Sequence, residues 1–303
     1  MKLLALSLLL CGIATAQSAK DAMLQAVVKN AVAPGYVRLA EKCRNLTAAC
    51  ELLEKQPAVD SLENARGCWL AAAVAAQELD GFKIGPIADA GDVSAFYFVP
   101  IRSSSIERAI PGDGDLQQLG AAAKGLFAVE YMLFPKSEDA LARLAGDPKR
   151  RHYLSLIARE LEVKAARLEK SWREPAAESA KRFLSGGQNS LNALVNQMAM
   201  TTESVAVLRM DPDKQDRTPG SVSGNSPALL QAAIRGLHHI HSGGLNDYTR
   251  RLNPALADRV DREFTATVKV VSGESRNSLN VLHKVDLPST LGVTLTFIST
   301  DGD

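Results

Sequence analysis

Several common features are scarce in this sequence, and each scarcity argues against a class of protein. Aromatic residues make up 5% of the 303 residues, while Ala and Leu are abundant, which favours helices over sheets. The chain has 35 Lys and Arg against 34 Asp and Glu, so it lacks the basic excess that is typical of nucleic-acid binding or polybasic membrane binding. Hydrophobic residues make up 46% of the chain, which is too many for a disordered protein and normal for a globular one.

The first sixteen residues have the layout of a secretory signal peptide. A positive start at Met1-Lys2 is followed by an apolar run from Leu3 to Leu10 and by the small residues of Ala14-Thr15-Ala16, where cleavage is expected. Cys11 offers lipidation as an alternative, although Leu10 is larger than the residue that normally precedes a lipoprotein cysteine. No later stretch approaches the ~18 apolar residues of a membrane span. We therefore predict export to the periplasm, association with the outer membrane as an option, and no transmembrane segment in the mature chain.

Few cysteines remain after cleavage, and export would permit them to form disulfides. Cys43 and Cys50 are seven residues apart on one predicted helix, about 10 Å along its axis, which is too far for a bridge. Cys68 lies on the next predicted helix, so a Cys50–Cys68 disulfide is favoured. A Cys43–Cys68 disulfide and three free cysteines are the alternatives.

Apolar residues recur at helical spacing along most of the chain. Helices are predicted over 20–55, with a break at Pro34-Gly35, and over 149–173, where the period is clearest. The sequence Ser226-Pro227 starts another helix. Two isolated strands, 95–99 and 291–299, have no evident partner. The prediction is an all-α protein of two helical bundles around a cleft, with bundles at 17–148 and 149–303.

One carboxylate stands alone in an apolar helix. Glu130 lies in the stretch from Gly125 to Phe134, and a buried carboxylate is costly unless it is paired, hydrogen-bonded or bound to a cation. A salt bridge to a neighbouring helix is the structural interpretation. A metal ligand in a bundle core is the functional one.

Three of the five histidines are clustered in Leu237-His238-His239-Ile240-His241. His238 and His241 share a helix face, so they could bind a metal together with a carboxylate. Histidines near Gly243-Gly244 could equally lie at a helix end and favour its dipole. Phosphate-binding glycine loops, His-Glu-x-x-His, Gly-x-Ser-x-Gly and Cys-x-x-Cys are absent from the sequence.

The stretch from Gly125 to Phe134 resembles the imelysin family, which is also classed as a peptidase M75 family. The hallmark of that family is Gly-x-His-x-x-Glu, and this chain keeps Gly125, Glu130 and Tyr131 but has Phe127 where the histidine would stand. Further similarities are Ala65-Arg66-Gly67-Cys68-Trp69, Gly85-Pro86 with the stretch 96–100, and the C-terminal stretch 291–303.

The resemblance implies two helical bundles facing each other across a cleft, a link to iron uptake, and metal binding through the His and Glu of the hallmark. Only Glu130 carries over as a ligand for iron or another divalent metal. A hydrolytic metal site needs about three protein ligands and a water. The hallmark of this chain supplies one, which argues against peptidase activity.

Three functional hypotheses follow. The first is an exported imelysin-like binding protein that serves iron acquisition without catalysis. The second is a metallopeptidase that uses His238 and His241 as substitute ligands near Glu130. The third is a module that binds a periplasmic or outer-membrane protein partner, in which Glu130 pairs with a cation such as Arg66.

Overall fold

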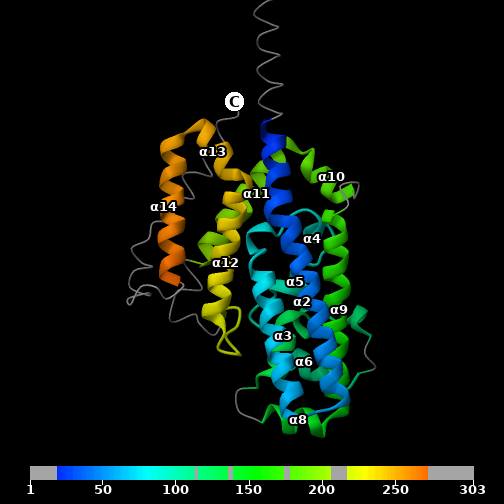
Figure 1. The fold of residues 1–303 in the computed structure, drawn as a ribbon. Helices are drawn as coiled ribbons and strands as arrows, with labels where there is room; N and C mark the ends of the chain where they lie inside the picture. Colours follow the sequence, from blue (N-terminus) through cyan, green and yellow to red (C-terminus); the bar gives the residue numbers. More distant parts are fainter. Residues whose placement is uncertain (1–18, 113–114, 136–138, 174–177, 206–216, 272–303) are drawn as a thin grey trace, which may run out of the picture.

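The computed structural model describes residues 19–112, 115–135, 139–173, 178–205 and 217–271, and every regular element in these ranges is helical (Figure 1). The predicted all-α class is therefore confirmed. The predicted signal peptide and the predicted strand at 291–299 lie outside the described residues. The other predicted strand, at 95–99, is wrong, because helix α5 occupies Val93–Tyr97.

Three long helices form the centre of the molecule. Helix α2 (Ala33–Lys55) packs against α3 (Val59–Gln77) and along α9 (Pro148–Arg173). The apolar positions of α9 that recur at intervals of three and four residues are buried, including Leu154, Ile157 and Leu161, as the periodicity predicts. The sequence prediction placed this helix in the second bundle, at 149–303. In the structure its apolar face packs along α2, and the spacing of apolar residues shows only that a face is buried and not which helix covers it.

The predicted break at Pro34-Gly35 does not occur. A π-helical turn over Val28–Val32 leads directly into α2, with Pro34 in the first turn of that helix. Because the chain is helical on both sides of Pro34, its missing N–H removes one hydrogen bond of the helix, and the π-helical turn directly before it is where the regular α-helical pattern changes.

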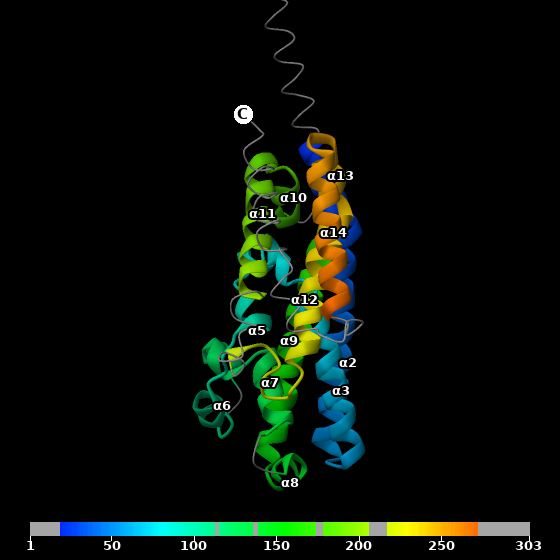
Figure 2. The same ribbon diagram turned by 90° about the vertical axis from the view of Figure 1, so that its left-hand side faces the viewer.

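A second group of helices lies beside α3 (Figures 1 and 2). Helix α12 (Ser226–Ile240) packs against α3, and α14 (Pro254–Val271) packs against α12 and α13 (Asn246–Leu252). A π-helical segment, η7 (His241–Leu245), joins α12 to α13. The predicted start of a helix at Ser226-Pro227 is confirmed.

Shorter elements complete the fold. They are η2 (Asp80–Phe82), α4 (Pro86–Asp89), α5, α6 (Ser103–Ala109), η3 (Leu116–Gln118), η4 (Ala121–Ala123), α7 (Leu126–Leu133), α8 (Ala140–Gly146), α10 (Glu178–Leu184) and α11 (Gly187–Ser204). One apolar core runs from Met23 to Phe264 and includes residues of both helix groups. The two groups are thus joined by continuous packing.

Within the described residues, no helix combines the length and the apolar character that crossing a membrane requires.

Candidate functional site

The motif helix α7 begins at a glycine that no other residue could easily replace. Gly125 has φ +97°, and a Cβ atom there would lie 2.7 Å from the carbonyl oxygen of Ala95. Only glycine adopts this conformation readily and also permits such close contact with a backbone. The first hallmark residue therefore sets where α7 starts.

Helix α3 holds both ends of α7. The indole N–H of Trp69 donates to the carbonyl oxygen of Leu126 at 2.9 Å, and the Nε of Arg66 donates to the carbonyl oxygen of Leu133 at 3.0 Å. Arg66 also pairs with Glu63 and lies over the ring of Phe134, 5.0 Å from its centre. Arg66 and Trp69 thus position the motif helix, and Arg66 is not the partner of Glu130.

Glu130 is buried, with 2% of its surface exposed. Its Oε1 accepts two hydrogen bonds from Ser223, one from the backbone N–H at 2.8 Å and one from the hydroxyl at 2.7 Å. Ser223 belongs to the segment just before α12, so this carboxylate links the motif helix to the second helix group. Such charge-assisted bonds are each worth about 1.5–3 kcal/mol.

Phe127 is packed into the core, at 2% exposure. It fills, with an apolar ring, the position where the hallmark has its histidine. This turn of α7 therefore carries one potential metal ligand, Glu130, where the hallmark has two.

Tyr131 belongs to a charged cluster that the sequence did not reveal. Its hydroxyl donates to Glu107 at 2.8 Å, Arg143 contacts the same carboxylate at 2.9 Å, and Arg150 contacts both of its oxygens. Partial burial would raise the pKa of Glu107, but the hydrogen bonds from Arg150 and Tyr131 outweigh it and leave the pKa below its usual value. Because Glu107 lies on α6 and Arg150 on α9, no sequence spacing links them.

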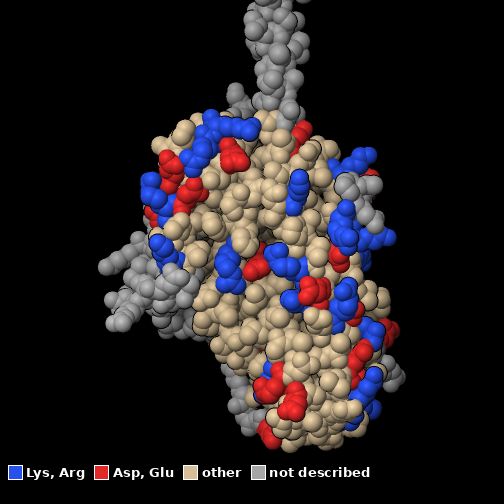
Figure 3. All heavy atoms as spheres, viewed as in Figure 1, with Lys and Arg blue, Asp and Glu red and all other residues tan. Residues whose placement is uncertain are grey.

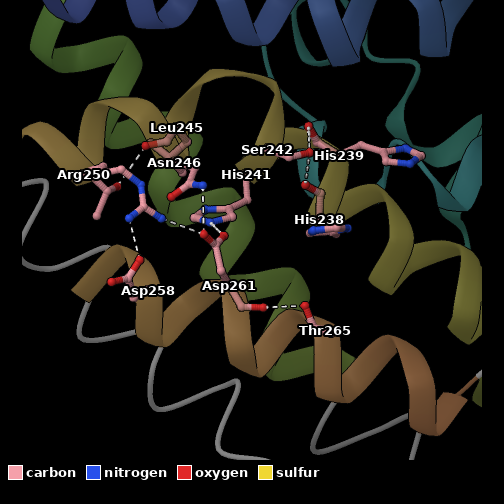
Figure 4. A network of polar contacts seen from close by, with 11 residues as sticks. His238, His239, His241, Ser242, Leu245, Asn246, Arg250, Asp258, Asp261 and Thr265 are labelled. Carbon is pink, nitrogen blue, oxygen red and sulfur yellow. Dashed lines mark hydrogen bonds and ion pairs between the residues drawn. The ribbon is translucent and has the colours of Figure 1, made fainter. Parts of the chain in front are cut away.

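The histidine cluster forms a separate polar network with α14 (Figure 4). His241 is fully buried, its Nε2 lies 3.1 Å from Oδ1 of Asp261, and its ring is stacked on Phe264. Arg250 contacts the other oxygen of Asp261 at 2.9 Å. Burial lowers the pKa of His241, with Asp261 opposing it in part.

The other two histidines do not complete a metal site with it. His238 packs against the Phe264 ring, and burial lowers its pKa too. In Figure 4 the ring of His239 points away from His241 and Asp261.

Glu130 and the histidines lie at opposite ends of α12. Glu130 contacts the segment before Ser226, and His238 follows Ser226 by twelve residues, about 18 Å along a helix at 1.5 Å per residue. One metal ion cannot contact both. The metallopeptidase hypothesis, which needs these residues within ~8 Å of each other, loses its ligand set.

The described side chains around Glu130 do not make up the ligand set of a resident metal ion. Among the residues that the structure describes, no group of three His, Cys, Asp or Glu side chains is placed to hold one. The Oε1 atom of Glu130 already accepts two hydrogen bonds from Ser223. In the described part of the site, the charge of the Glu130 carboxylate is stabilised by hydrogen-bond donors of the protein.

Cys43, Cys50 and Cys68 are free thiols in the structure. Cys50 is fully buried, and burial is the main reason that its pKa is raised. The Cys50–Cys68 bridge is not formed here and stays a prediction for the exported protein.

A pocket of about 760 Å³ opens between the two helix groups. It is lined by residues of η1, α2, α3, α12 and η7, namely Asn30, Ala31, Arg38, Lys42, Ala71, Val74, Ala75, Glu78, His239, Ser242 and Gly243. We call it the central pocket. Sequence analysis missed every charged residue in it, because Arg38, Lys42 and Glu78 are ordinary surface residues of their helices until α12 is placed opposite them.

The fold and site together define an all-helical protein with a pocket between two helix groups and a motif helix whose carboxylate is hydrogen-bonded to the segment before α12. The family model described as Imelysin, of the peptidase M75 type, matches residues 32–281. The chain therefore belongs to the imelysin family.

Individual relatives agree with this membership. A protein named Iron-regulated protein A from Synechococcus elongatus is 24% identical, over 80% of this chain and 72% of its own length. The crystal structure of an imelysin-like protein from Psychrobacter arcticum has a TM-score of 0.73 at 17% identity. That of a protein described as an iron-regulated protein A precursor from Parabacteroides distasonis has a TM-score of 0.69 at 16% identity. Each structural match covers 94% of both chains, so the fold is shared over nearly its whole length.

Proposed function

We propose that this chain is an exported, non-catalytic binding protein of the imelysin family that serves iron acquisition. Iron, or another divalent metal, is the cargo in this proposal and not a resident cofactor. The binding would take place in the cleft between the helix groups.

The observation that carries this proposal is the state of Glu130. A hydrolytic metal centre needs about three protein ligands and an activated water. Glu130 instead accepts two hydrogen bonds from Ser223, and Phe127 places an apolar ring one turn earlier. This arrangement favours a structural role for the motif over hydrolysis.

Two further observations support the iron link and the export. A relative with 24% identity is named Iron-regulated protein A. The N-terminal pattern of residues 1–16 is that of a signal peptide, which would deliver the mature chain to the periplasm, where an outer-membrane partner would be within reach.

The test is equilibrium binding of iron to the mature protein, measured with ferrous iron, ferric iron and ferric citrate, alongside a peptidase assay on unfolded protein substrates. We expect iron to bind in at least one form and no peptide bond to be cleaved. Glu130→Gln, which keeps an acceptor oxygen, is expected to leave the iron affinity within about threefold. Iron-dependent cleavage that is lost in Glu130→Gln would reject the proposal in favour of a peptidase. If iron fails to bind in all three forms, the partner-binding hypothesis takes its place.

A further inference from the structure

The central pocket has an apolar floor and a polar rim. The floor is made of small side chains, Ala71, Val74 and Ala75, on one face of α3. The rim carries Arg38 and Lys42 from α2 on one side, with His239 and Ser242 on the other. A concave apolar surface with a few convergent polar groups is the usual form of a small-molecule site, and about 760 Å³ is within the usual size.

A close contact between α12 and α3 fixes the far wall of the pocket. A Cβ atom on Gly236 would lie 2.0 Å from the carbonyl oxygen of Glu78, so a glycine is needed where the two helices touch. Arg235 and His239 flank this contact on α12, four residues apart and therefore on neighbouring turns. The helix contact holds both of them next to α3.

Basic groups outnumber carboxylates at this rim. Glu78 lies between two guanidinium groups, with Arg38 and Arg235 each 3.4 Å from one of its oxygens. Lys42 pairs with Glu41 at 2.9 Å. Of the residues that line the pocket, Arg38 and Lys42 are cations and Glu78 is the carboxylate, and Arg235 approaches Glu78 from outside the lining. Figure 3 shows Lys, Arg, Asp and Glu side chains across the middle of the face in view.

The contacts of Glu78 are long and partly open to solvent. The side chains of Arg38 and Arg235 are 43% and 37% exposed, and ordinary charged hydrogen bonds are ~0.5 Å shorter than these contacts. A guanidinium carries five N–H donors, and each of these two makes one contact with Glu78. Donor groups therefore remain available at the mouth of the pocket.

We propose that the central pocket binds a small polycarboxylate anion, with Arg38 and Lys42 contacting its carboxylates and the imidazole of His239 supplying a further hydrogen bond. The volume exceeds what one phosphate or carboxylate group fills, which favours a ligand with several carboxylates on a short carbon frame. If the proposed iron function holds, the ligand is an iron chelate of such an anion, and this identity of the ligand rests on that function.

The test is calorimetric titration of the mature protein with citrate, ferric citrate and inorganic phosphate, at low salt. We expect Arg38→Gln combined with Lys42→Gln to weaken citrate binding at least about tenfold. The matched control is Arg182→Gln, which removes an exposed arginine that pairs with Asp89 outside the pocket and is expected to change the affinity less than about twofold. Circular dichroism checks that each variant is folded.

Glu78→Gln is expected to change the citrate affinity in the direction opposite to the Arg38 and Lys42 double variant. Removing this carboxylate leaves Arg38 and Arg235 without their shared partner, so citrate binding is expected to tighten about threefold or more. A pocket that only holds the helices together would respond to both variants in the same direction. Citrate affinity that is unchanged in the Arg38 and Lys42 double variant, or weakened in Glu78→Gln, overturns the proposal. Phosphate binding as tight as citrate binding overturns the polycarboxylate assignment.

The same titrations separate this proposal from the proposed function. Citrate binding that depends on Arg38 and Lys42, without binding of iron in any form, keeps the pocket and rejects the iron function. Iron binding that the double variant leaves unchanged keeps the iron function and rejects the pocket as its site.

Discussion

Glu130 and Glu78 are two carboxylates at the junction of the same two helix groups, and they are held in opposite ways. Glu130 is 2% exposed and accepts bonds of 2.7 and 2.8 Å from one serine. Glu78 has a side chain that is 15% exposed and two arginine contacts of 3.4 Å. One oxygen of the first accepts two hydrogen bonds from the protein, and the second lines a pocket.

This difference separates stability from binding. A charge that is buried and satisfied by protein donors holds elements together, and removing it leaves a buried donor without a partner. A charge that is partly exposed and paired only through long contacts contributes little to stability but can exchange its partner for a ligand. Glu130 thus joins α7 to the segment before α12, whereas Glu78 lines the candidate binding pocket.

The largest expected effect tests this contrast directly. Glu130→Ala is expected to lower the free energy of unfolding by about 3 kcal/mol, because it removes two charge-assisted hydrogen bonds to a buried carboxylate and leaves the partly buried N–H of Ser223 without this acceptor. Glu78→Gln is the matched variant, and we expect it to cost less than about 1 kcal/mol. Urea unfolding followed by circular dichroism measures both. Equal losses would remove the distinction between the two carboxylates.

A pair of glycine variants sharpens the role assigned to the motif. Gly125→Ala is expected to cost about 2–3 kcal/mol, since φ is +97° and the new Cβ would meet the Ala95 carbonyl oxygen. Gly67→Ala, on the exposed face of α3 with nothing within 4 Å of its Cβ, is expected to stabilise by about 0.5–1 kcal/mol. The same unfolding curves measure both. A mild effect at Gly125 would mean that α7 can begin elsewhere.

The smallest effect concerns the histidine network at the other end of α12. Burial lowers the pKa of His241 below its ordinary value near 6.5, and its Nδ1 has no hydrogen-bond partner among the described residues. The unfolded chain therefore takes up a proton first as the pH falls, and stability drops below about pH 6.5 by at most ~1.4 kcal/mol per pH unit.

His241→Gln is expected to flatten that slope between pH 5 and 7 without affecting citrate binding. Unfolding free energies measured at several pH values check it. An unchanged slope would show that His241 does not titrate differently in the folded and unfolded states.

Much of the fold could be predicted because its signals are local. The spacing of Leu154, Ile157 and Leu161 predicts one buried helix face, and all three are buried. The segment 95–99 misled because aromatic and β-branched residues favour strands only where a partner strand exists, and here Phe96 is buried in a short helix instead.

The candidate site was predictable only in part. An acid in an apolar helix pointed to Glu130, whereas its partner Ser223 lies 93 residues away in a polar loop with no distinguishing pattern. Glu107 gave no signal either, because its cationic partner Arg150 is on α9, 43 residues along the chain.

The sequence by itself determined the helical class, the family motif with Phe127 in the histidine position, and the burial of Glu130. These follow from properties of neighbouring residues: period, side-chain volume and the cost of an isolated charge. Only the tertiary structure decided what Glu130 bonds to and where a pocket opens. Glu78 meets Arg38 across 40 residues and Arg235 across 157, and such meetings depend on how whole helices pack, which no local pattern encodes.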